Sequence, residues 1–66
     1  MNVIVNGKPT ELSHAATVAA LVEHLQLGAK RVAVEVNKDL VVKNEWPAKV
    51  LKEGDQVEIV SFVGGG

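Results

Sequence analysis

The chain has 66 residues, a formal net charge of −1 with a pI of about 6.0, and no cysteine. This length predicts one small domain, and the lack of cysteine excludes disulfides, cysteine nucleophiles and cysteine metal sites. The slightly negative net charge gives no indication of a basic surface that would bind nucleic acid. No stretch approaches the roughly 20 apolar residues of a membrane span. We expect a protein that binds neither nucleic acid nor membrane. The missing cysteine and the missing signal peptide favour the cytoplasm.

The first expected element is a β-hairpin. Residues 1–6 are mostly apolar and β-branched, and Asn6-Gly7 is a turn signal that leads into a second strand over residues 8–12. Pro9 lies in this second strand. Because proline lacks the N–H that a central strand needs, it indicates a sheet edge.

A helix from Thr17 to Leu27 is expected next. Apolar residues recur there at i, i+3, i+4 and i+7 and form one stripe: Val18, Leu21, Val22 and Leu25. Threonine is a good N-cap residue, and Gly28 is the expected stop at the other end.

The hydrophobic period then returns to two, which is typical of strands. Residues 31–36 alternate valines with other residues and predict a half-buried strand. Asn37-Lys38-Asp39 predicts a turn into a short return strand over residues 40–42.

A connector over residues 43–51 separates these strands from the last one. It contains Trp46-Pro47, and we expect Trp46 to cover the small core. Glu53-Gly54-Asp55 predicts a turn, and residues 56–63 predict the final strand.

This order of elements predicts an α+β domain, with one main helix packed on one face of a mixed sheet. The final strand is expected to run through the middle of the sheet, beside the first strand. Its alternation directs Glu58, Val60 and Phe62 to the face away from the helix. The side chains expected to be largely buried are Val3, Val5, Leu21, Leu25, Val34, Val57 and Ile59.

The last three residues are Gly64, Gly65 and Gly66. We expect a domain over residues 1–63 and a flexible glycine tail over residues 64–66. Glycines have no Cβ and add nothing to a core. The tail is therefore either a frayed end or a carrier of the Gly66 α-carboxylate, which glycines allow to enter a narrow channel in a partner. Val60 and Phe62, beside the tail, are the expected partner-binding patch.

Other residues offer little catalytic chemistry. His14 and His24 have no partner at metal-ligand spacing, so no metal site is expected. No apolar pocket is expected around the acidic residues to raise a carboxyl pKa, so no catalytic residue is expected. These acids are Glu35, Glu45, Glu53, Asp55 and Glu58.

In combination, several segments resemble the ThiS family of thiamin-biosynthesis sulfur carriers. The segments are Val5-Asn6-Gly7, Ala33-Val34-Glu35-Val36-Asn37, Val41-Val42 with Glu45-Trp46, residues 53–60 and Val63-Gly64-Gly65-Gly66. The resemblance covers essentially the whole chain in order. No single segment is specific; the specificity lies in their combination with a terminal Gly-Gly. The resemblance implies a ubiquitin-like β-grasp fold.

The resemblance also implies the chemistry. An E1-like adenylating enzyme, similar to ThiF or MoeB, would use ATP to activate Gly66, and a persulfide donor would convert the carboxylate to a thiocarboxylate. A ThiG-like thiazole synthase would then take this sulfur to build the thiazole of thiamin. Gly64 and Gly65 would thread into the partner's active site. The chain has no phosphate-binding loop and no cysteine, so we expect it to bind no cofactor. The resemblance implies a protein cosubstrate rather than an enzyme.

Two other classes stay open. One is a related β-grasp carrier, such as the small subunit of molybdopterin synthase, or a ubiquitin-like modifier conjugated to lysines. Molybdopterin-type carriers are usually longer and carry proline near the tail, where this chain has Ser61-Phe62-Val63. The other is a binding module with an inert tail, for which we would expect a polar or charged end.

Overall fold

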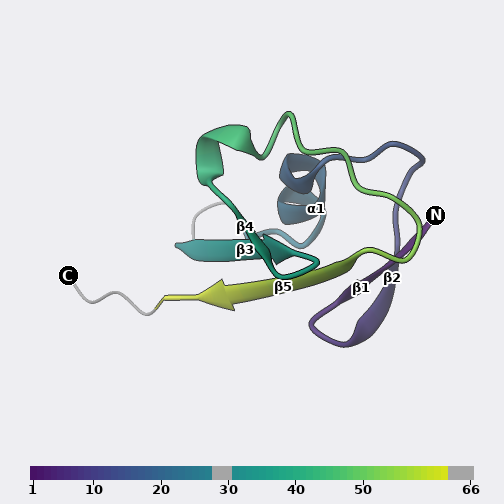
Figure 1. Cartoon of the computed structure of the whole chain (residues 1–66), viewed down its shortest axis with the longest axis horizontal. Helices are drawn as coiled ribbons and strands as arrows, with labels where there is room; N and C mark the ends of the chain where they lie inside the picture. The colour runs from purple at the N-terminus through teal and green to yellow at the C-terminus, as the bar shows by residue number, and fades with distance from the viewer. Residues whose placement is uncertain (28–30, 63–66) are drawn as a thin grey trace.

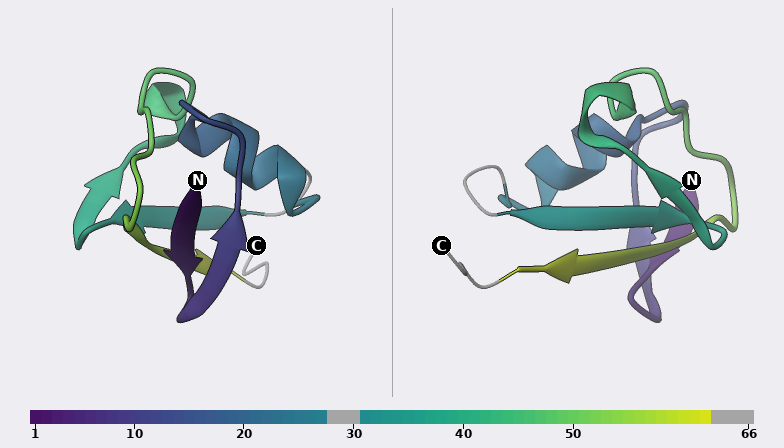
Figure 2. Two further views of the ribbon diagram at one scale, coloured as in Figure 1. Left: turned by 90° about the vertical axis from the view of Figure 1, so that its right-hand side faces the viewer. Right: turned by 60° about the vertical axis from the view of Figure 1, so that its left-hand side comes forward.

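The computed structural model describes residues 1–27 and 31–62. In this part of the chain, the helix α1 (Val18–His24) lies on one face of a five-stranded mixed sheet (Figures 1 and 2). The strands are β1 (Asn2–Val5), β2 (Lys8–Glu11), β3 (Val32–Val36), β4 (Asp39–Val41) and β5 (Gln56–Ser61), and the short 3-10 helix η1 (Lys43–Glu45) follows β4. The predicted architecture, one helix on a mixed sheet, is confirmed.

β5 is the central strand, as predicted, because the strand order is β2-β1-β5-β3-β4. It runs parallel to β1 and antiparallel to β3, and Val57 lies opposite both Val5 and Val36. β2, which contains Pro9, is an edge strand, as the proline indicated.

Two tight turns connect neighbouring strands. Asn6 and Gly7 join β1 to β2 with φ values of 48° and 82°, and Asn37 and Lys38 join β3 to β4 with values of 51° and 74°. Positive φ at both central residues is the type I′ pattern, whose twist matches that of the flanking strands. Lysine therefore occupies a backbone conformation in which glycine is favoured.

The N-terminus of α1 is capped by two separate parts of the chain. The Thr17 Oγ1 accepts a hydrogen bond from the Ala20 N–H at 3.1 Å, which confirms the predicted cap. The carbonyls of Lys49 and Trp46 accept the N–H groups of the first two helical residues at 2.9 and 3.1 Å. Because these N–H groups have no partner within a helix, the connector completes the first turn of α1.

The helix ends at His24, earlier than predicted. Gln26 adopts a φ of 59°, and its N–H donates to the Glu23 carbonyl at 2.9 Å. The Leu27 N–H donates to the Val22 carbonyl at 3.2 Å. This pair of bonds is a Schellman motif, in which Gln26 takes the left-handed position where glycine is commonest. The prediction of Gly28 as the stop lies outside the described residues, as do those on the tail and on a domain boundary after residue 63.

The core lies between α1 and the sheet. Its buried apolar residues are Val3, Val5, Leu12, Val18, Leu21, Val22, Val34, Val36, Val41, Trp46, Leu51 and Val57. Trp46 covers the core as expected, and its indole N–H donates to the Val41 carbonyl at 2.9 Å.

Of the side chains expected to be largely buried, Leu25 and Ile59 are the least covered. Both are only partly buried against the core. The pairing of β1 with β5 ends at Val5 opposite Val57, so the first hairpin does not extend alongside Ile59. Leu25 and Ile59 face the core as predicted, but the first hairpin covers less of this end of the sheet than expected.

Candidate functional site

The end of β5 carries the two candidate residues that the structure describes: Val60 lies on the strand, and Phe62 follows its last residue. The antiparallel pairing with β3 continues to Val32 opposite Ser61, and the Phe62 N–H donates to the Arg31 carbonyl at 2.8 Å. The backbone is thus held on the sheet up to Phe62, and in the sequence only Val63 separates Phe62 from the glycine segment. Figure 1 shows β5 extending beyond the first hairpin toward this end of the chain.

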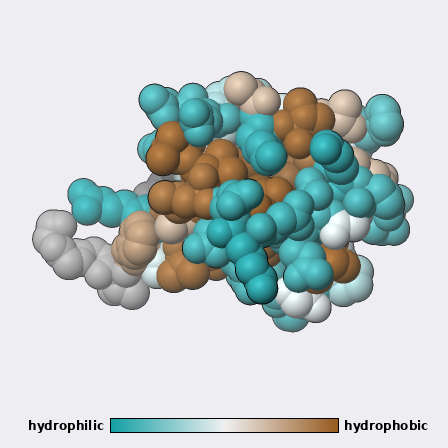
Figure 3. Space-filling model, in the orientation of Figure 1, coloured by the Kyte–Doolittle hydropathy of each residue, from teal (hydrophilic) through white to brown (hydrophobic). Residues whose placement is uncertain are grey.

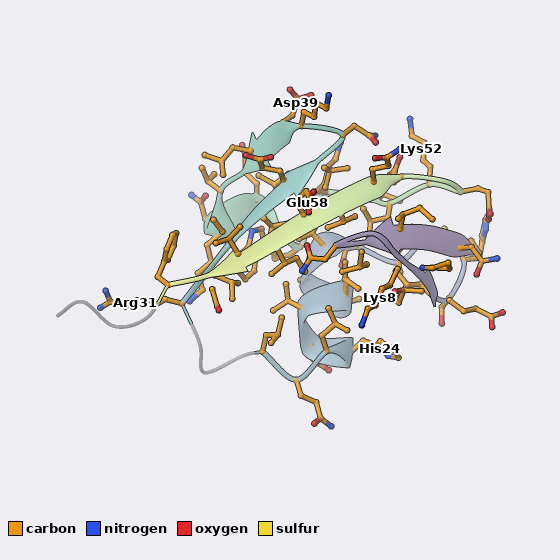
Figure 4. All side chains as sticks on the ribbon, turned by 90° about the horizontal axis from the view of Figure 1, so that it is seen from below. Lys8, His24, Arg31, Asp39, Lys52 and Glu58 are labelled. Carbon is orange, nitrogen blue, oxygen red and sulfur yellow. The ribbon has the colours of Figure 1, made fainter. Side chains whose placement is uncertain are left out.

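Val60 and Phe62 form the expected apolar patch on the face of the sheet away from α1. Their side chains are 59% and 55% exposed. Ala33 lies opposite Val60 on β3, and Glu35 lies opposite Glu58. Figure 4 views this face and shows Glu58 on β5, while Figure 3 shows apolar atoms beside the grey atoms at the end of the chain. Large apolar side chains exposed next to one another are typical of interaction surfaces.

On its other edge, β5 is bonded by the side chain of Asn6. The Asn6 Oδ1 accepts a hydrogen bond from the Ile59 N–H at 2.7 Å, and its Nδ2 donates to the Ile59 carbonyl at 3.1 Å. The side chain takes the place of one more residue of β1. The sequence marked Asn6 as a turn residue only, because nothing in the local pattern links it to Ile59.

Two of the acids considered for catalysis organise the turn before β5 instead. Asp55 accepts hydrogen bonds from the Lys52 N–H at 2.8 Å and from the Asn37 Nδ2 at 3.0 Å. Glu53 accepts from the Asn2 N–H at 2.9 Å. These carboxylates fix where β5 enters the sheet.

Neither a metal site nor a membrane span is apparent in the described ranges, 1–27 and 31–62. They contain no group of three or more His, Cys, Asp or Glu side chains arranged to hold a metal ion, and both His14 and His24 are exposed. No helix found there combines the length and the apolar character needed to cross a membrane.

Comparison with known proteins identifies the family. The sequence profile of the ThiS family matches residues 3–66. The chain belongs to the ThiS family. The sulfur carrier protein ThiS of Bacillus subtilis is 39% identical over 62 residues, covering 92% of this chain and 94% of that protein. The crystal structure of the thiamine biosynthesis protein ThiS from Geobacter metallireducens superimposes with a TM-score of 0.84 at 36% identity, covering 100% of both chains.

The fold is therefore the ubiquitin-like β-grasp of ThiS, as the resemblance implied. Longer proteins also contain a ThiS-like segment. The thiazole synthase of Paramagnetospirillum magneticum is 38% identical over 66 residues, which are 100% of this chain and 20% of that protein. The chain thus spans about a fifth of the length of this relative.

Proposed function

We propose that this chain is the sulfur carrier for formation of the thiazole of thiamin. The observation that supports the proposal most strongly is the match to the ThiS family, which includes the glycine segment. The position of β5 adds support, because the backbone is held on the sheet up to Phe62, and only Val63 separates Phe62 from that segment in the sequence.

The proposed chemistry starts at the Gly66 α-carboxylate, which is ionised and unreactive at neutral pH. An E1-like enzyme joins it to AMP from ATP and releases pyrophosphate. The terminal sulfur of a persulfide then displaces AMP, and a thiol cleaves the resulting S–S bond to leave the thiocarboxylate. The chain contributes the reacting group and its presentation, while the partners contribute ATP binding, sulfur and catalysis, because this chain has no cysteine.

The proposed acceptor of the sulfur is a thiazole synthase. Thiazole synthases that contain a ThiS-like segment support this pairing, because they join the two parts in one polypeptide. The carrier is accordingly a cosubstrate rather than an enzyme, and we place it in the cytoplasm with these partners. The apolar patch of Val60 and Phe62 is the proposed docking surface, and Gly64 and Gly65 are the residues that enter the partner's active site.

The tail is tested by the intact mass of the chain after incubation with the activating enzyme, ATP and a persulfide donor. The parent chain should gain the mass of one oxygen-to-sulfur exchange, located at Gly66 by fragmentation. Deletion of Gly66 moves the carboxylate by about 3.3–3.6 Å, whereas catalytic geometry tolerates about 1 Å, so conversion should fall steeply. Gly65→Val should also fail, because a β-branched side chain restricts the backbone and widens the tail.

Both tail variants should melt with the parent chain, since neither residue contributes a side chain to the core. The matched control is Gly54→Ala, which changes a glycine with a φ of 82° in a turn. It should lower the melting temperature but leave conversion of the folded chain intact. Parental conversion of both tail variants would refute the carrier proposal.

A further inference from the structure

The two edges of β5 are paired over different lengths. Even-numbered residues direct their backbone groups toward β3, as the Phe62 N–H to Arg31 carbonyl bond and the Asn37 N–H to Gln56 carbonyl bond show. Odd-numbered residues direct theirs toward β1, where the Asp55 and Val57 carbonyls accept hydrogen bonds. By this alternation, the N–H and carbonyl of Ser61 face the β1 side.

The first hairpin stops before it reaches Ser61. Its last rung on β5 is the pair of hydrogen bonds between the Asn6 side chain and the Ile59 backbone. Figure 1 shows that the hairpin lies beside the first part of β5 and that β3 accompanies the strand further. Within residues 1–27 and 31–62, the hydrogen bonding of β5 on the β1 side therefore ends at Ile59, two residues before Ser61. Ser61 itself is exposed.

A pocket of about 170 Å³ adjoins this edge. Its lining residues are Asn6, Leu25, Leu27, Val32, Ile59 and Ser61. The four apolar residues among them are the partly buried ones at the uncovered end of the core. The N–H and carbonyl of Ser61 thus lie next to an apolar pocket.

We propose that an extended segment of the thiazole synthase adds to β5 at Ser61 and places one aliphatic side chain in this pocket. Strand addition combines these two elements, since main-chain hydrogen bonds give affinity and pockets for alternate side chains give specificity. The edge requires an extended backbone, and the apolar lining requires an uncharged side chain.

The synthase is the assigned occupant because thiazole synthases that carry a ThiS-like segment hold the two parts in one polypeptide. This assignment rests on the proposed function, while the contact itself needs neither ATP nor sulfur.

Amide hydrogen exchange of the unmodified chain tests the proposal directly. In the free chain the Ser61 amide should exchange faster than the Phe62 amide, which donates to Arg31 at 2.8 Å. Addition of the synthase should slow Ser61 exchange at least about tenfold, since protection reports a new backbone hydrogen bond. An unchanged Ser61 amide in the saturated complex would overturn the proposal.

A pair of substitutions at one position tests the energetics. Ser61→Pro removes an N–H that is bonded to no strand in residues 1–27 and 31–62, and proline is tolerated where the N–H faces away from the ladder. Ser61→Ala removes the same hydroxyl but keeps the N–H. The proline variant should bind the synthase on the order of tenfold more weakly than the alanine variant. Equal affinities would contradict strand addition.

Leu27→Trp tests the pocket separately, because a larger side chain fills it, and weaker binding at a parental melting temperature is expected. Parental affinity would show that the pocket stays empty in the complex. If Ser61 protection in the free chain instead rises with protein concentration, a second copy occupies the edge and our assignment is wrong.

These measurements are independent of the carrier chemistry. Protection of Ser61 without thiocarboxylate formation would refute the proposed function and keep the contact. Thiocarboxylate formation without protection of Ser61 would keep the proposed function and refute the contact.

Discussion

Asn6 has two structural tasks at the residue scale. Its backbone closes the first hairpin at a φ of 48°, and its side chain forms both hydrogen bonds to the Ile59 backbone. Few residue types satisfy both demands, because asparagine tolerates the left-handed region and carries a donor and an acceptor.

Two substitutions of Asn6 separate these tasks. Asn6→Gly keeps the backbone conformation but loses both hydrogen bonds, and should lower the free energy of unfolding by about 1–2 kcal/mol. Asn6→Ala should lower it by roughly a further 1 kcal/mol, because alanine is strained at positive φ. Urea denaturation measures both values. A glycine variant as stable as the parent would show that the bonds to Ile59 contribute nothing.

Lys38 offers the opposite case, a residue poorly suited to its backbone. Its φ of 74° is the position that Gly7 fills in the first hairpin at 82°. Lys38→Gly should therefore raise the free energy of unfolding by about 0.5–1 kcal/mol, the relief of strain less the entropy of glycine in the unfolded chain. The reciprocal change, Gly7→Lys, should lower it by a similar amount. Destabilisation by Lys38→Gly would refute the strain argument.

At the scale of elements, α1 is buried unevenly along its length. Leu21 is fully buried, whereas Leu25, one turn later, is only partly buried. The difference follows from the sheet below, because β1 does not extend to the end of β5 that lies under Leu25.

The same substitution at these two leucines measures that difference. Leu21→Ala should cost about 2–5 kcal/mol, as expected for a buried leucine that leaves a cavity. Leu25→Ala should cost less than about 2 kcal/mol, because less apolar area is removed from contact and water reaches the site. Thermal and urea unfolding of both variants check this, and equal costs would mean that Leu25 is as well covered as Leu21.

These leucines also show what the sequence predicts. The spacing of apolar residues gave the direction of Leu25 and Ile59 correctly, because direction follows from the local period. How well they are covered depends on where β1 ends. The turn at Asn6 sets that end, and Asn6 is 53 residues from Ile59 in the sequence. The exposure of Val60 and Phe62 was predictable for the same reason as the directions. The end of the helix was not predictable. Gln26 adopts the left-handed conformation that ends the helix, whereas residue preferences had pointed to Gly28 for this position.

At the scale of the whole molecule, the patch of Val60 and Phe62 should bind partners without supporting the fold. Phe62→Ala should weaken association with the synthase or the activating enzyme by roughly thirty-fold, the effect of losing an aromatic anchor of about 2 kcal/mol. Its melting temperature should stay near that of the parent, since the side chain is 55% exposed.

Val50→Ala is the control for this prediction. Val50 is 48% exposed in the connector and lies outside the patch, so its truncation should change neither property. A large drop in the melting temperature of Phe62→Ala would assign Phe62 to the core instead.

The capping of α1 by the connector has a consequence for how the chain folds during synthesis. The first turn of the helix is completed by Trp46 and Lys49, which leave the ribosome after both β3 and β4. The strand that joins the two halves of the sheet, β5, emerges later still. No N-terminal fragment that lacks β5 therefore contains the complete sheet, and β5 pairs with residues of β1 and β3 that are distant in sequence. We therefore expect helix and sheet to form together, in one cooperative step, once β5 is available.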